Sequence, residues 1–172
     1  MVFEMLFVRQ AYQQALAHEL RKIVRTLRAH PSDRLDERQP GCAVSARDLA
    51  LELVHRVRRI DDIAWAGAVA LPRPAISTRG ELLLELETAW LGTHAALVQL
   101  PSTHWSEVIA APAEFATFRQ ARRGELLWLA LRELVRHSRH LAQHVRGGCA
   151  GGGRHRSEPK PRNPVDEFAA SA

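Results

Sequence analysis

The sequence has few cysteines, few aromatic residues and almost no lysine. Its 172 residues include two cysteines, Cys42 and Cys149, which are too few for the disulfide framework of a small secreted domain. Neither cysteine has a second one nearby, which argues against a zinc site built from cysteine pairs. Aromatic residues make up 6% of the chain, and no basic run is interleaved with them as a platform for single-stranded nucleic acid requires.

Long apolar runs are also absent. No stretch approaches the ~20 consecutive apolar residues of a membrane span. Residues 1–10 are apolar, but the segment is short and contains Glu4, so it reads as the start of a helix and not as a signal peptide. We therefore expect a cytoplasmic protein with no membrane partner. The net charge is +5, but the basic residues are spread over every segment, so we do not expect nucleic acid as a partner either.

Four segments of the chain have the hydrophobic spacing of amphipathic helices. They cover, in order, about residues 2–29, 45–63, 78–99 and 122–146. The second and third begin with capping residues, since Asp48 follows Ser45 by three positions and Glu81 follows Thr78 by three. Residues 100–121 are irregular and indicate a long crossover with a short helical piece. No segment alternates as a strand does, so the sequence predicts an all-α four-helix bundle.

The chain ends in a segment that cannot support a core. Residues 147–172 are rich in glycine, proline and charged residues, a composition typical of disorder. We therefore expect one domain, residues 1–146, followed by a disordered tail at residues 147–172. The length of the chain fits one domain of ordinary size.

Polar and aromatic residues of the helices leave two alternatives open. Glu87 and His94 share the azimuth of Leu86, Leu97 and Val98, which predicts that all five face inward. The two polar side chains would then either reach the rim of the core or pair with arginine, or else line a pocket. Three tryptophans are candidates for a pocket wall, although core packing is their commoner role: Trp65, Trp90 and Trp128.

The last helix, residues 124–146, carries the strongest functional signal. One carboxylate and three imidazoles follow the edge of its apolar stripe: Glu133, His137, His140 and His144. Glu133 and His137 are four residues apart, as are His140 and His144, so each pair projects toward one spot and suits a metal ion. The alternative is that they are half-buried boundary residues, whose rings pack while their nitrogens reach water.

The order of these elements and the motif GELLWLALRELVRHSRH resemble the DinB-like superfamily. This superfamily includes the bacillithiol- and mycothiol-dependent transferases and the N-terminal domain of mycothiol-dependent maleylpyruvate isomerase. The resemblance covers roughly residues 5–146 and implies an up-down-down-up bundle with a long crossover before the last helix. The family's last helix carries a ligand, three further residues and a His ligand, and Glu133 and His137 fall on those two positions.

The second helix of that family supplies a third ligand, a histidine. The present sequence, PGCAVSARDLALELVHRV, departs from the motif because Glu52 occupies the histidine position and His55 lies one turn further on. Helix geometry favours Glu52, which borders the apolar stripe. The chemistry of a soft divalent ion favours the imidazole of His55. Both residues stay candidate metal ligands.

The resemblance implies a divalent ion, zinc, nickel or iron, with three protein ligands and one open position. Such an ion would lower the pKa of a low-molecular-weight thiol, which would then attack a small-molecule substrate. His140 and His144 would be the catalytic residues that move protons. The resemblance therefore predicts a metal-dependent thiol transferase or isomerase.

The competing hypothesis is not an enzyme. A bundle of this kind also suits a non-catalytic module that binds a partner or a second copy of itself, as a homodimer, and keeps a degenerate metal site. The sequence alone does not decide between the two.

Overall fold

The structure is a computed structural model. It describes residues 2–39, 42–65, 76, 78–112, 115, 117 and 119–147, and the side chains from residue 7 onward. The expected tail lies outside the described residues apart from Gly147, so the domain boundary at residue 146 stays a prediction.

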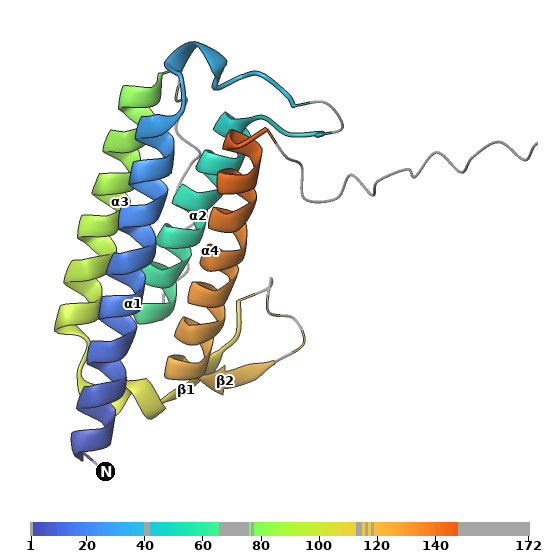
Figure 1. Ribbon diagram of the computed structural model, residues 1–172. Helices are drawn as coiled ribbons and strands as arrows, with labels where there is room; N and C mark the ends of the chain where they lie inside the picture. The colour runs from blue at the N-terminus through green and yellow to red at the C-terminus, as the bar shows by residue number, and fades with distance from the viewer. Residues whose placement is uncertain are drawn as a thin grey trace, which may run out of the picture.

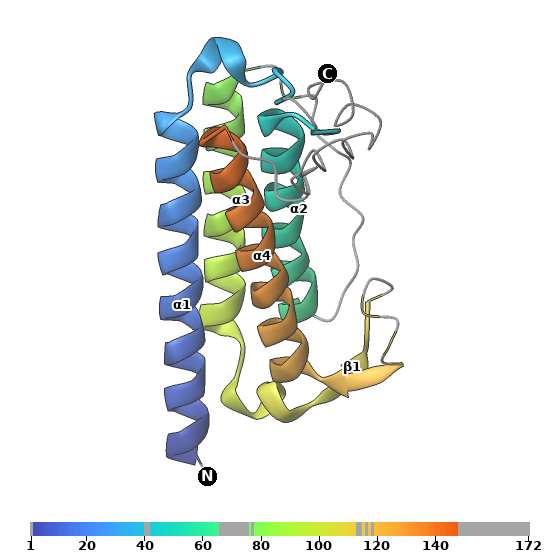
Figure 2. The ribbon, with the colours of Figure 1, turned by 45° about the vertical axis from the view of Figure 1, so that its right-hand side comes forward.

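Four helices form a bundle (Figures 1 and 2). Their bounds are α1 Val2–Ala29, α2 Ala46–Trp65, α3 Arg79–Gln99 and α4 Arg123–Val145. α1 and α4 run in one direction and α2 and α3 in the other, which confirms the all-α bundle in up-down-down-up order. α2 packs closely against both α3 and α4, whereas α1 packs less closely against its two neighbours. Among the described residues, no helix is long and apolar enough to cross a membrane.

The expected caps start α2 and α3. The backbone and hydroxyl of Ser45 both donate to Asp48 Oδ2 at 2.9 Å, and the Asp48 backbone donates to the Ser45 hydroxyl at 3.2 Å. Thr78 and Glu81 form a complete capping box. In each case two backbone donors at a helix start are satisfied by local side chains, which is why the sequence located these starts.

The connection between α3 and α4 stays at one end of the bundle (Figures 1 and 2). It contains the expected helical piece, the 3-10 helix η2 Ser102–Ser106, and an antiparallel pair of strands, β1 Val108–Ala110 and β2 Gln120–Arg122. The strands were not predicted, because three residues are too few to show alternation. A second 3-10 helix, η1 Ser32–Arg34, follows α1.

The core lies between the four helices and is almost entirely aliphatic. Its largest fully buried side chains are Tyr12, Leu16, Ile23, Leu27, Leu35, Leu53, Ile60, Ile63, Leu82, Leu86, Leu97 and Leu126. The charged side chain of Arg123 is also buried, at the start of α4. Its guanidinium donates to the backbone oxygen of Ala64 at 3.0 Å and to Glu107 Oε2 at 2.9 Å, and thereby joins α2, α4 and the segment between η2 and β1.

The orientation of α3 differs from the prediction. Glu87, His94 and Val98 are exposed and do not face inward. The buried face instead includes Leu82, Ala89, Thr93 and Ala96 besides the expected Leu86 and Leu97. The physical reason is that α3 is apolar on most of its circumference, so hydrophobic spacing did not fix its rotation. Small residues allow a close approach to α2, and Thr93 donates to the Val57 backbone oxygen there at 3.1 Å.

Candidate functional site

The structure places Glu133 and His137 side by side on α4, as their spacing predicts. Glu133 Oε2 lies 3.9 Å from His137 Nε2. The guanidinium of Arg136 contacts both groups: it donates to Glu133 Oε2 at 3.0 and 2.6 Å and lies 3.2 Å from His137 Nε2. Because a guanidinium only donates, Nε2 is the acceptor in this contact. A positive side chain thus contacts both atoms that would hold the metal ion.

The electrostatic surroundings keep His137 neutral. Burial lowers the pKa of the His137 imidazole, and the charges of Arg56 and Arg136 lower it further. The carboxylates of Glu52 and Glu133 act in the opposite direction but are the weaker influences. Since both Glu52 and Arg56 act on His137, this turn of α2 lies near the His137 turn of α4.

The two candidate ligands of α2 lie on the same helix, one turn apart. Glu52 Oε1 accepts hydrogen bonds from Arg56 Nε at 2.8 Å and from Arg56 Nη2 at 2.7 Å. His55 is half-buried. The carboxylate on each helix is therefore neutralised by an arginine of its own helix.

The described residues show no ready site for a divalent metal ion. Within the described part of the chain, no group of three or more His, Cys, Asp or Glu side chains is arranged to hold one. The prediction of a metal-binding protein is therefore wrong for this part. The spacing of Glu133 and His137 was right, but Arg136 and Arg56 supply the positive charge that the metal would have supplied.

The two histidines predicted as catalytic lie further along α4. The ring centroid of His140 lies 5.9 Å from that of His137, with the rings nearly perpendicular. His144 is buried, and its Nε2 has no hydrogen-bond partner within the described structure. These positions do not test a role in proton transfer, which stays a prediction.

Two grooves border α1, one on each side. The first, which we name the α1–α4 groove, has a volume of about 720 Å³. Its apolar lining consists of Ala15 from α1, Ala121 from β2, and Trp128, Leu129, Leu131 and Val135 from α4. Two charged side chains of α4, Glu125 and Arg132, complete its wall.

Three aromatic rings in edge-on contact support the wall of the α1–α4 groove. The buried ring of Tyr12 meets the Trp128 ring edge-on at a centroid distance of 5.2 Å and the Trp105 ring at 5.5 Å. Trp105 is buried, whereas Trp128 is 40% exposed. Burial also raises the pKa of the Tyr12 hydroxyl, which stays neutral. Trp128 is therefore held in place from behind while its outer side faces solvent.

The second groove, the α1–α3 groove, has a volume of about 600 Å³. Its apolar lining includes Leu20 and Val24 of α1 and Leu83 and Leu86 of α3. Its polar and aromatic residues are Arg21, Arg25 and Arg28 from α1 and Glu87 and Trp90 from α3. Trp90 and Trp128 thus belong to groove walls, as the pocket alternative proposed, and Trp65 is 58% exposed.

Sequence reasoning missed these grooves because they depend on how α1 packs against its neighbours. Amphipathic spacing identifies which face of a helix is buried, but it does not reveal a gap between two helices. One signal was present: Trp128 lies next to Leu129 on the side of α4 away from its main stripe. A large apolar pair outside the core stripe indicates a second apolar surface.

The comparisons with known proteins give one similarity. The chain is 30% identical over 127 residues to regulatory protein RecX from Geobacillus thermodenitrificans (strain NG80-2). The match takes in 69% of this chain and 44% of that protein, so the chain spans less than half the length of the relative. No family model matches the chain, and no solved structure matches it.

This similarity corrects the resemblance drawn from the sequence. The DinB-like assignment rested on one ligand pair and a helix order, and the matched relative is a regulatory protein. The predicted transferase or isomerase, with its small-molecule substrate, is therefore wrong, and the non-catalytic alternative agrees better with the comparison. Over 127 residues, the chain is thus similar to a regulatory protein.

Proposed function

We propose that this chain is a non-catalytic regulatory module that binds a helix of a partner protein in the α1–α4 groove. The observation that carries the proposal is the apolar lining around Trp128. The similarity to regulatory protein RecX supports the regulatory role, and the chain corresponds to 44% of that protein.

The surface chemistry of the groove favours a protein partner. A contiguous apolar surface in water is typical of an interaction site. Trp128 is 40% exposed, and covering that part of the ring removes roughly 80 Å² from water and contributes about 2 kcal/mol. Tryptophan and arginine are the residue types most enriched among energetically dominant interface residues, and the groove contains Trp128 and Arg132.

The shape of the groove favours a helix as the bound element. Residues of α4 at positions 125, 128, 129, 132 and 135 form one helical stripe that makes up one wall. The opposite wall presents Ala15, whose small side chain permits close approach. An amphipathic helix inserts apolar residues spaced three, four and seven apart into a groove of this kind.

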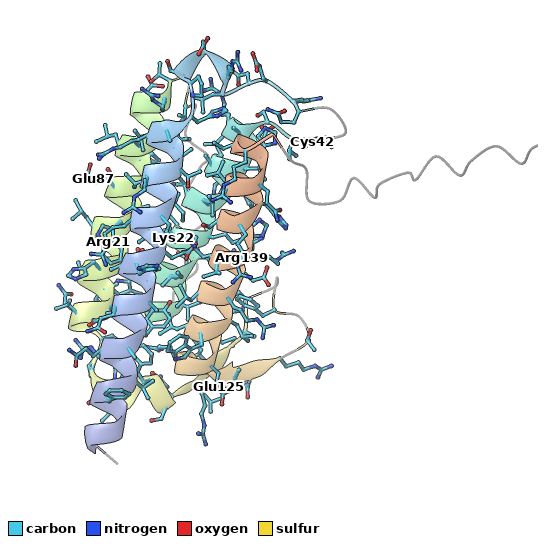
Figure 3. All side chains as sticks on the ribbon, viewed as in Figure 1. Arg21, Lys22, Cys42, Glu87, Glu125 and Arg139 are labelled. Atoms are coloured by element: carbon cyan, nitrogen blue, oxygen red, sulfur yellow. The ribbon has the colours of Figure 1, made fainter. Side chains whose placement is uncertain are left out.

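The charges at the groove define what the partner helix should carry. Glu125 and Arg132 are seven residues apart, a separation of about 10 Å along α4. A partner helix that lies along α4 would therefore place a basic residue near Glu125 and an acidic residue near Arg132. Figure 3 shows Glu125 at the lower end of α4, near the strands.

A peptide selection tests this proposal even while the partner protein is unidentified. Random 20-residue peptides displayed on phage would be selected against the full 172-residue chain, and enriched peptides would be synthesised and titrated. We expect apolar residues at helical spacing, flanked by opposite charges about two turns apart. In the Leu129→Glu variant, we expect the dissociation constant to rise about ten-fold or more, since a charge would enter the apolar lining.

Leu91→Glu is the matched control, because Leu91 is 61% exposed on α3 and does not line the groove. Circular dichroism and thermal unfolding should show that both variants keep the fold. Arg132→Glu should weaken the binding of a peptide that has an acidic residue near position 132. Replacing that acidic residue of the peptide by lysine should restore its affinity for the variant. Equal binding by the Leu129→Glu and Leu91→Glu variants, or no enrichment over a carrier protein, would refute the proposal.

A further inference from the structure

The α1–α3 groove contains a row of arginines that the proposed function does not use. Arg21, Arg25 and Arg28 follow one another at spacings of four and three residues, so they lie along one side of α1. All three are exposed, and within the described residues no guanidinium of the three has a hydrogen-bond or ion-pair partner. Like charges at this spacing repel and destabilise the helix, so a bound anion would relieve that repulsion.

Other arginines of the chain contrast with this row. Arg47 is paired with Asp36, Arg58 with Glu85 and Arg123 with Glu107. In the α1–α3 groove one carboxylate, Glu87, lines the opposite wall. Positive side chains of α1 thus lie across the groove from one negative side chain of α3. Figure 3 shows Arg21 on α1 and Glu87 on the neighbouring α3.

Trp90 adds a planar apolar surface to the same groove. It is half-buried, and its ring lies 5.1 Å from the ring of His94 at an angle of 57°. Because α1 and α3 run in opposite directions (Figures 1 and 2), Arg28 and Leu83 lie toward one end of the groove and Trp90 toward the other. Guanidinium groups thus extend from one end of the groove toward an aromatic ring at the other.

We propose that the α1–α3 groove binds a nucleoside phosphate with two or more phosphate groups. The phosphates contact the guanidinium groups of Arg25 and Arg28, which lie one turn apart on the same side of α1 and can each donate two hydrogen bonds to a phosphate. The base lies against Trp90, and Glu87 accepts a hydrogen bond from an amino or hydroxyl group of the nucleoside. The volume of about 600 Å³ lies within the range of small-molecule sites.

The two grooves share no lining residue, so each proposal has its own test. Either proposal can fail while the other stands.

Isothermal titration of the full chain with ADP at physiological salt tests the proposal. We expect saturable binding that is weakened about ten-fold or more in the Arg25→Gln variant and unchanged in the Arg139→Gln variant. Arg139 is the matched control because it is also an exposed arginine, on α4 and outside both grooves (Figure 3). In the Trp90→Leu variant, ADP should bind more weakly, whereas inorganic pyrophosphate should bind as it does to the unaltered chain.

Several outcomes would overturn the proposal. Pyrophosphate binding as tightly as ADP would show that the ring makes no contribution. Binding of a 20-nucleotide single-stranded DNA without binding of ADP would assign the row of arginines to a polyanion surface instead. An equal loss of ADP affinity in the Arg25→Gln and Arg139→Gln variants would indicate a general charge effect. Absence of binding at millimolar ADP would exclude the site. Circular dichroism of each variant establishes that the fold is kept.

Discussion

The buried arginine at the start of α4 gives the sharpest test of the structure. Arg123 is 5% exposed in its side chain, whereas its partner Glu107 is 48% exposed. Removing Glu107 therefore leaves a charge in the core, and removing Arg123 leaves a carboxylate that water already reaches. Unpaired buried charge costs far more than an unpaired charge in water. We expect Glu107→Ala to destabilise the protein more than Arg123→Met does.

The magnitudes follow from the contacts that each change removes. Arg123→Met loses the hydrogen bond to the Ala64 backbone oxygen and the charge-assisted one to Glu107 but keeps the apolar volume of the side chain. We expect this change to lower the free energy of unfolding by about 2 kcal/mol. Glu107→Ala leaves Arg123 with the Ala64 oxygen as its side-chain partner, and the cost is about 3 kcal/mol, the lower end for a broken buried pair.

Urea unfolding followed by circular dichroism measures both changes as shifts of the midpoint. Arg139→Met is the control, since Arg139 is exposed on α4 and its replacement should change the free energy of unfolding by less than about 0.5 kcal/mol. The reverse order of the two costs, or a loss below about 1 kcal/mol for both variants, would refute the buried position of Arg123.

Three further predictions concern single positions. Thr78→Ala removes the capping box of α3 and should lower the free energy of unfolding by about 1 kcal/mol in the same urea assay. Since burial lowers the pKa of His137, the unfolded chain takes up its proton first, so stability should fall as pH falls from above ~6.5 through the folded-state pKa. His137→Gln should flatten that part of the pH profile, and an NMR titration of His137 with a midpoint above ~6.5 would contradict it. Gly124→Ala would place a Cβ 3.1 Å from both Cε3 and the backbone oxygen of Trp105. We therefore expect a lower melting temperature despite the higher helix propensity of alanine. A higher melting temperature would show that Trp105 moves easily.

The parts of the fold that local chemistry determines could be predicted from the sequence. Ser45 and Thr78 correctly predicted where α2 and α3 begin, because each capping side chain and its acidic partner lie within four residues of one another. The number of the helices followed from hydrophobic spacing, whereas their up-down-down-up order was implied by the DinB-like resemblance. The rotation of α3 did not, because Leu84 and Leu91 are apolar and yet 64% and 61% exposed, so the pattern had no single apolar face.

The candidate site shows a different limit of sequence reasoning. The spacing of Glu133 and His137 correctly predicted that they are neighbours. Spacing does not show which positive group these two side chains contact, and Arg136, one residue from His137, contacts both of them. The two grooves depend on the distance between α1 and its neighbours, which is a property of the whole packed bundle.

If both proposed grooves bind their ligands, the position of α1 between them would link the two binding events thermodynamically. Each groove has α1 as one wall, and α1 is the helix packed less closely against its neighbours. A ligand in either groove that restricts the motion of α1 reduces the entropy that the other must give up on binding. Linkage makes the effect reciprocal, so each ligand raises the affinity for the other by the same factor. With both sides of α1 occupied, one binding event in the bundle would then depend on the other.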